Sequence, residues 1–270
     1  MNYRNLIFLH IPKAAGTTLH TILEKHYPRA SYYSIVEESK RHLQEFGERP
    51  QKERDKIRLL KGHFPYGGHQ HLVGPSTYVT LLRNPVDRVI SHYYFVKRTP
   101  RHYLYPRVTA ENMDLAAYIT SHITEELDNG QVRLLCGVDG DIPWGACGRE
   151  HLEQAKRNIT EHFAVAGVLE RFDESLALMG HKLDWQWTPY YENQNITKEK
   201  NERLEPSTLD VIRKANELDL ELYEWVSARL EKELDDNKDE VARRLDAMQK
   251  AQNTVHPLET LRKLVRRPIG

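Results

Sequence analysis

Residues 6–18 read LIFLHIPKAAGTT. Residues 6–9 form an apolar run without polar alternation, which favours a strand buried on both faces of a parallel sheet. After the run, Leu19, Ile22 and Leu23 recur at helical spacing. The chain therefore passes from strand to helix within a few residues, and this order predicts an α/β domain.

The turn between this strand and helix has the composition of an anion site. Free backbone N–H groups and the positive end of the helix dipole meet there, and a glycine lets a phosphate approach the backbone. A lysine adds a full positive charge, and two threonines add hydroxyl donors. We predict phosphate binding by Lys13, Ala14, Ala15, Gly16, Thr17 and Thr18.

The order of these residues differs from the common triphosphate-binding loop, in which the lysine follows the second glycine. Here Lys13 precedes Gly16, and residues 6–11 hold no glycine. Pro-Lys-x-x-Gly-Thr-Thr resembles the 5′-phosphosulfate loop of the sulfotransferases. The wording His-Ile-Pro-Lys resembles the branch with the heparan sulfate 2-O- and 6-O-sulfotransferases and their bacterial relatives. The alternative is a plain strand–turn–helix corner with a surface lysine.

A second strand and helix follow at residues 77–97. Asn84 and Pro85 have the chemistry of a helix cap and a first helical residue. Arg83 ends the strand, where side chains of parallel sheets face the ligand crevice. Its guanidinium and the hydroxyl of Ser91 suit a phosphate.

The segment from Leu82 to Ser91 resembles the 3′-phosphate motif of sulfotransferases, with arginine and serine at the family spacing. Two phosphate sites on one nucleotide imply 3′-phosphoadenosine 5′-phosphosulfate (PAPS), because ATP has no 3′-phosphate. In this interpretation Arg88 lies on the helix surface, paired with Asp87 or a neighbouring glutamate.

Sulfuryl transfer needs in-line positioning, charge neutralisation and a base for the acceptor proton. Lys13 is placed to stabilise the leaving phosphate oxygen. Of the candidate bases His10, His63, His69 and His71, we favour His63, which follows a glycine beyond a predicted strand and resembles the family's base. We predict that His10 structures the loop.

Two other activities remain open. An ATP-dependent phosphotransferase would need Mg²⁺, but no acidic residue stands beside the two threonines. A non-catalytic nucleotide-binding or saccharide-binding module would keep the fold without turnover. His63, His69 and His71 could bind a metal, but no nearby cysteine or carboxylate completes the set, and we expect no metal requirement.

Composition narrows the function further. Lysine plus arginine equals aspartate plus glutamate at 39 each, so no overall field favours nucleic acid. No run approaches the ~18 apolar residues of a membrane helix. A strand near residue 5 leaves no room for a signal peptide, so we expect a cytoplasmic protein. Two cysteines, Cys136 and Cys147, cannot form a disulfide framework.

Alternating apolar and amphipathic segments predict a P-loop-like sulfotransferase fold. This is a mostly parallel central sheet flanked by helices, with a helical C-terminal region. We assign residues 1–236 to the sulfotransferase domain and 237–270 to a helical extension packed on the domain or on a partner. Residues 98–112 are expected to be a loop, and 113–136 and 206–234 helical.

The acceptor is expected to be a hydroxyl compound, with a saccharide favoured. The basic side chains between Arg98 and Arg107 are either solvated or receive an anionic sugar such as a sulfated or uronic-acid saccharide. Tyr190, Tyr191, Asn195 and Thr197 resemble a late family segment that could line the cleft.

Overall fold

The computed structural model describes residues 3–36, 39–138, 141–191 and 204–265, with side chains described as far as residue 253. The described strands form one sheet in the order β2-β3-β1-β4-β5, and every neighbouring pair is parallel. This confirms the predicted α/β class. The strands are β1 Asn5–Leu9, β2 Tyr32–Ile35, β3 Leu59–Gly62, β4 Ser76–Leu82 and β5 Phe163–Val168.

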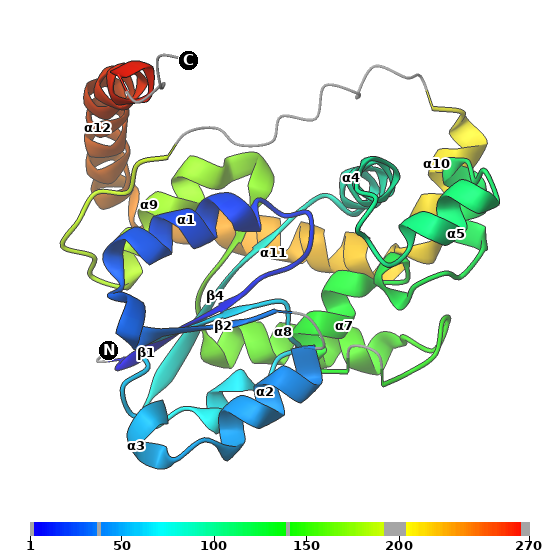
Figure 1. The fold of residues 1–270 in the computed structure, drawn as a ribbon, viewed down its shortest axis with the longest axis horizontal. Coiled ribbons are helices and arrows are strands. Elements are labelled where there is room, and N and C mark those ends of the chain that lie inside the picture. Colours follow the sequence, from blue (N-terminus) through cyan, green and yellow to red (C-terminus); the bar gives the residue numbers. More distant parts are fainter. Residues whose placement is uncertain (1–2, 37–38, 139–140, 192–203, 266–270) are drawn as a thin grey trace.

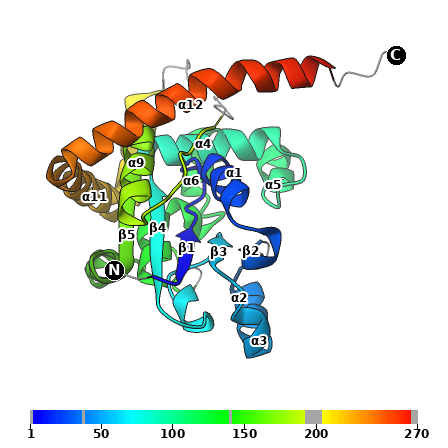
Figure 2. The same cartoon turned by 90° about the vertical axis from the view of Figure 1, so that its left-hand side faces the viewer.

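Helices cover both faces of the sheet. Their bounds are α1 Gly16–His26, α2 Ser39–Glu48, α3 Gln51–Arg54, α4 Pro85–Arg98, α5 Tyr105–Ala110, α6 Leu115–Thr120, α7 Gly130–Cys136, α8 Arg149–His162, α9 Phe172–Lys182, α10 Pro206–Ala215, α11 Glu217–Asp236 and α12 Lys238–Val265. Figure 1 shows α1 and α9 above the sheet, and α2 and α8 below it. Figure 2 shows the strand order from β5 across to β2.

The central strand β1 sits where the chain switches direction across the sheet. It pairs with β3 on one side and β4 on the other, with Leu9 aligned with Gly62. Its residues are fully buried, as the apolar run predicts. In open α/β sheets, ligands bind at the carboxyl ends of strands beside such a switch point. The segments that follow β1, β3 and β4 therefore share one edge.

Three predicted segments differ from the structure. The expected loop at 98–112 contains the short helix α5. The expected helix at 113–136 is divided into α6, a 3₁₀ turn at Glu125–Leu127 and α7. His122 and Asn129 interrupt it, each with a left-handed φ of 50°, and Asn-Gly is a turn signal that outweighs the apolar periodicity. The expected helix at 206–234 is likewise divided at Asn216.

The C-terminal helices pack on different parts of the domain, with α10 on α6 and α4, α11 on β5 and α12 on α9. Helix α11 lies against β5, an edge strand, and so covers backbone groups that an exposed edge would leave unpaired. Residues from 238 form α12, which contacts α9 and buries Val241 and Met248. Within the described part of the chain, no helix is both long and apolar enough to span a bilayer.

Candidate active site

The loop after β1 holds two residues in a strained conformation. Lys13 has φ 68° and Ala15 has φ 56°, and such left-handed non-glycine residues cost about 1–3 kcal/mol each. Ala15 directly precedes α1, and among the described residues no side chain caps this helix. Its first N–H groups therefore remain suited to an anion, as the sequence predicts.

Gly16 is required by a neighbour that the sequence did not indicate. A Cβ at this position would lie 1.5 Å from Nε2 of His10. The imidazole of His10 is buried against the loop, with Nδ1 3.0 Å from Nε2 of His20. The glycine therefore makes room for His10, and close approach of a phosphate to the same residue stays a prediction.

His63 follows β3 and stands at the same edge of the sheet. Its Nδ1 lies 2.9 Å from the carbonyl oxygen of His10 and donates to it. This bond fixes the tautomer of a neutral ring and leaves Nε2 as a proton acceptor. The ring lies 3.9 Å from the His10 ring, centroid to centroid, while the residue as a whole remains exposed. It is thus fixed on one side and accessible on the other.

The pKa of His63 suits a base. Desolvation by the surrounding protein lowers the pKa below 6.5, and the nearby Lys13 ammonium lowers it further. The His10 carbonyl and the Glu126 carboxylate oppose this shift without cancelling it. The imidazole is therefore neutral at pH 7 and able to take a proton.

Lys13 points its ammonium toward α4. Its Nζ lies 3.8 Å from the centroid of the Phe95 ring. Burial lowers the pKa of Lys13 to about 8, and Arg98 and Arg83 add to the shift. A positive charge under these conditions would be stabilised by an anionic ligand.

Arg83 is held firmly at the end of β4. Its backbone N–H donates to Oε1 of Gln131 and its carbonyl accepts from Nε2 of the same residue, both at 3.0 Å. Its Nη1 donates to the carbonyl oxygen of Lys13 at 3.0 Å. The guanidinium therefore connects the two predicted phosphate motifs directly.

The helix after Arg83 begins as its sequence predicts. Asn84 caps α4 by accepting from the N–H of Val86 at 3.0 Å, and Pro85 follows. Ser91 is buried on this helix, one turn before Phe95. Because residues four apart share a helix face, Ser91 lies on the face that contacts Lys13.

Arg88 is buried, contrary to the predicted surface position. It is 1% exposed and lies 3.8 Å from the Asp219 carboxylate. It also donates to the carbonyl oxygen of Glu126. The arginine joins α4 to α11, a contact between distant segments that no local pattern could indicate.

Asp219 and Asn129 cap each other's helices. The Asp219 carboxylate accepts from the N–H groups of Gln131 and Val132 at 3.1 and 2.8 Å. In return, Oδ1 of Asn129 accepts from the N–H groups of Leu218 and Asp219 at 2.9 and 3.1 Å. This pair fixes α7 against α11, and with it the Gln131 side chain that holds Arg83.

Glu126 is a site residue that the sequence reasoning missed. Its Oε2 lies 3.4 Å from Nε2 of His92, whose Nδ1 lies 2.8 Å from the Tyr118 hydroxyl. Burial raises the pKa of Glu126, but His92, Arg88 and His63 outweigh it and lower the pKa to about 2. The carboxylate is therefore ionised, and it interacts electrostatically with Lys13 as well as His63.

The other two candidate histidines diverge from His63. Nδ1 of His69 lies 2.7 Å from the Tyr78 hydroxyl, whereas His71 packs on Gly47 and accepts from Arg54 through its carbonyl. Among the described residues, no three histidine, cysteine or carboxylate side chains are arranged so that they could hold a metal ion. The alternative metal set of His63, His69 and His71 is therefore not assembled.

The late aromatic segment lies at the far end of α1. The Tyr190 ring packs under Lys25, and the Tyr191 hydroxyl bonds to Asp173. The first contact lies away from the loop at 13–18, whereas Asp173 is in the first turn of α9, just after the carboxyl end of β5. Asn195 and Thr197 lie outside the described residues.

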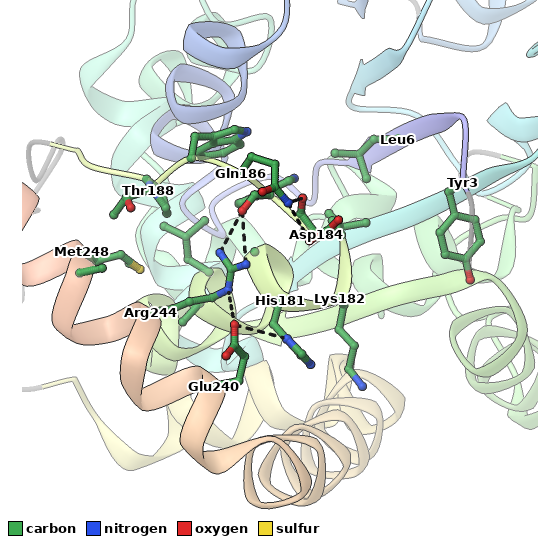
Figure 3. A pocket seen from close by; sticks show the side chains of 18 of the residues that line it. Tyr3, Leu6, His181, Lys182, Asp184, Gln186, Thr188, Glu240, Arg244 and Met248 are labelled. Carbon is green, nitrogen blue, oxygen red and sulfur yellow. Dashed lines mark hydrogen bonds and ion pairs between the residues drawn. The ribbon is translucent and has the colours of Figure 1, made fainter.

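A large cavity also lies away from this edge. It has a volume of about 900 Å³ and is lined by the start of β1, the end of α9 and the first half of α12. Figure 3 shows Arg244 in this cavity between Glu240 and a backbone carbonyl. That carbonyl belongs to Trp185, 3.2 Å from Nη1. Because Asn5 and Leu6 line it, the cavity is at the amino end of β1, opposite Lys13.

Comparison with known proteins gives one family. The pattern described as the sulfotransferase family matches residues 2–226. A heparin sulfate O-sulfotransferase of Drosophila melanogaster is 25% identical over 169 residues, covering 57% of this chain and 48% of that protein. A protein-tyrosine sulfotransferase of Arabidopsis thaliana is 32% identical over 142 residues, covering 52% and 26%. The chain thus spans about half or less of these relatives' length.

Among solved structures, mouse sulfotransferase SULT7A1 complexed with PAP matches with a TM-score of 0.39 and 14% identity. The match covers 79% of this chain and 65% of the mouse chain.

Proposed function

The chain belongs to the sulfotransferase family, and on this premise we propose that it transfers the sulfuryl group of PAPS to a hydroxyl of a carbohydrate. One observation carries the proposal. Lys13, His63 and Arg83 follow three adjacent strands and meet at one edge of the sheet, linked by the His63–His10 and Arg83–Lys13 bonds.

The residues present fit a nucleotide with two phosphate groups. The uncapped start of α1, with Lys13 to Thr18, would hold the 5′-phosphosulfate. Arg83, with Ser91 on the neighbouring helix, would hold the 3′-phosphate. When bound, PAPS supplies the sulfuryl group, which leaves the 5′-phosphate as the acceptor oxygen bonds to sulfur.

His63 serves as the base in this proposal. Its Nδ1 is engaged by the His10 carbonyl, so Nε2 takes the proton of the acceptor hydroxyl. Lys13 stabilises the negative charge that develops on the phosphate side. Both assignments are supported by the lowered pKa of each group, which keeps His63 neutral and leaves Lys13 responsive to an anion.

The acceptor class is proposed from the names of the two relatives and from the sequence of residues 10–13. By its name, the Drosophila relative acts on heparin sulfate and the Arabidopsis relative on protein tyrosine. We favour a carbohydrate because the His-Ile-Pro-Lys wording of residues 10–13 resembles the carbohydrate branch. Because the Arabidopsis relative is named for protein tyrosine, a tyrosine peptide also belongs in the acceptor panel.

Calorimetry and labelled transfer test the proposal together. We expect 3′-phosphoadenosine 5′-phosphate (PAP) to bind without magnesium and ATP to bind far more weakly. We expect His63→Ala to lose about 10²–10⁴-fold in transfer, the range for a general base, with PAP affinity unchanged within a few-fold. His69→Ala is the matched control, because its ring bonds to Tyr78 instead.

Preference for ATP would replace this proposal with a phosphotransferase. Tight PAP binding without transfer to any acceptor would favour a binding module. Collapse of PAP affinity in His63→Ala would make His63 a binding residue and place the base elsewhere.

A further inference from the structure

An exposed aromatic ring stands beside the candidate site. Tyr103 is 67% exposed, more than any other large apolar side chain among the described residues. Its ring stacks on His102 with centroids 4.8 Å apart and planes 26° apart. The His102 ring lies 5.5 Å from that of Phe95, the residue that contacts Lys13. The exposed ring is therefore connected to the reacting centre through two aromatic contacts.

One hydroxyl connects this ring to the backbone of Glu126. Oγ1 of Thr124 accepts from the Tyr103 hydroxyl at 3.3 Å and from the backbone N–H of Glu126 at 3.4 Å. Thr124 is itself buried. Tyr103 and Glu126 are thus held in a fixed relation, although they come from different turns of the chain.

Glu126 is linked to Tyr103 through Thr124, and its side chain interacts with the reacting groups. His92 engages its Oε2, and the side chain as a whole stays 31% exposed. Its negative charge interacts electrostatically with Lys13, His63 and His102. An ionised carboxylate at this position can accept hydrogen bonds from hydroxyl groups of a ligand whose reacting oxygen faces His63.

We propose that Tyr103 and Glu126 form an acceptor subsite for a neutral sugar ring. The apolar C–H face of a pyranose packs on the exposed tyrosine ring, while the carboxylate accepts from the hydroxyls beside the reacting one. This inference rests on the proposed sulfotransferase function and specifies its acceptor.

The Glu126 carboxylate favours a neutral ring over a uronic acid at this subsite. A carboxylate on the reacting sugar would face Glu126, and two like charges at close range repel. Arg107, one of the basic side chains that the sequence leaves either solvated or available to an anionic sugar, pairs with Glu111 at 3.0 Å. That pair partly neutralises one of the predicted cations.

Ligand-observed NMR on the PAP-loaded protein tests the subsite without requiring turnover. The probes are the methyl pyranosides of glucose, galactose and mannose, methyl glucuronide, and a tyrosine peptide. We expect at least one neutral pyranoside to bind more tightly than the glucuronide and the peptide. Tyr103→Ala should weaken that binding about threefold to tenfold, the value of one aromatic contact, whereas Tyr103→Phe should retain most of it.

Glu126→Gln separates charge from shape. It should weaken the neutral pyranoside and strengthen the glucuronide, because the repulsion is removed while the size is kept. Glu125→Gln is the matched control, since Glu125 is the exposed neighbour in the same turn.

Three results would overturn the subsite: tighter binding of the glucuronide or the peptide to the wild type, no pyranoside binding to protein that does bind PAP, or unchanged binding in Tyr103→Ala. Failure of PAP to bind would instead count against the proposed function. The pyranosides can be measured without PAP in that event.

Discussion

Lys13 and Arg83 follow neighbouring strands and face one edge of the sheet, yet they are held by different means. Lys13 lies in a strained loop, with its ammonium on the Phe95 ring and a pKa lowered to about 8. Arg83 is bonded through both backbone groups to Gln131. Gln131 in turn is fixed by the reciprocal caps of α7 and α11.

The difference separates holding a ligand from acting on it. A preset arginine gains binding energy with little reorganisation. A desolvated lysine is poorly stabilised until negative charge arrives, so its interaction grows as charge develops on the leaving group. We therefore expect Lys13, in the strained loop, to contribute mainly to rate. We expect Arg83, which is held by hydrogen bonds, to contribute mainly to affinity.

The strongest test replaces each cation with methionine. We expect Lys13→Met to lower kcat about 10³-fold, as for loss of a charge-stabilising donor, with a smaller loss of PAP affinity of about tenfold or less. Arg83→Met should weaken PAP about 10–100-fold, as for loss of charged hydrogen bonds, and leave kcat at saturation nearly unchanged. Steady-state kinetics and PAP titration measure both. Equal losses in kcat and affinity for the two variants would remove the distinction.

A smaller perturbation, Gly16→Ala, alters the packing of the loop after β1 without removing a charge. In Gly16→Ala the new Cβ would collide with Nε2 of His10. Because His10 also orients His63 through its carbonyl, we expect loss of both PAP affinity and rate, each by at least about tenfold. Calorimetry with PAP and steady-state kinetics measure the two losses.

Gly145→Ala is the control for this glycine replacement. Gly145 has a left-handed φ of 78°, and no atom lies within 4 Å of the position that an added methyl group would take. The variant therefore carries backbone strain without a collision, and it should lower the melting temperature while PAP affinity and rate stay near wild type. Retention of full activity in Gly16→Ala would show that His10 can move freely.

A further variant changes Gln131, the residue that holds the Arg83 backbone in place. Gln131→Leu removes both bonds to the Arg83 backbone and leaves two buried polar groups unpaired. We expect PAP to bind about tenfold more weakly, with a kcat near wild type, because one lost bond pair is worth about 1–3 kcal/mol. Gln70→Leu, at an exposed position, is the control. A drop in kcat without a change in affinity would contradict this assignment.

The pH profile gives the mildest test. His63 must be neutral to accept a proton, so kcat/KM should rise with pH through a pKa below 6.5. Lys13 must be protonated, so kcat/KM should fall as pH passes about 8. Bound anionic nucleotide raises the lysine pKa, so the alkaline limb of kcat should lie higher than that of kcat/KM. Coincident alkaline limbs would argue that Lys13 does not contact the anion.

Local patterns were sufficient for the parts of the site that lie at strand ends. The apolar run before His10, the β-rich run before Arg83 and the Asn84-Pro85 cap each depend on a few adjacent residues. Alternation of strands and helices then brings their ends to one edge. This is why Lys13, His63 and Arg83 could be proposed together.

The supporting residues left no such signal. Gln131 and Asp219 matter because they meet Arg83 and Arg88 across 48 and more residues, and side-chain pairing at that range is invisible to periodicity. Arg88 looked solvated because charged residues are seldom buried. Glu126 follows another glutamate in a short turn, where nothing distinguishes one carboxylate from the other. The break at Asn129 was readable from Asn-Gly.

The reciprocal caps of Asn129 and Asp219 also order events in time. Lys13 and Arg83 leave the ribosome early. The Gln131 contacts that hold Arg83 depend on α11, which is synthesised more than 130 residues later. Because the chain is synthesised from its N-terminus, a sheet that formed before α11 emerged would leave Arg83 without these supporting contacts. Nucleotide would then bind about tenfold more weakly, as expected for Gln131→Leu, until α11 docks.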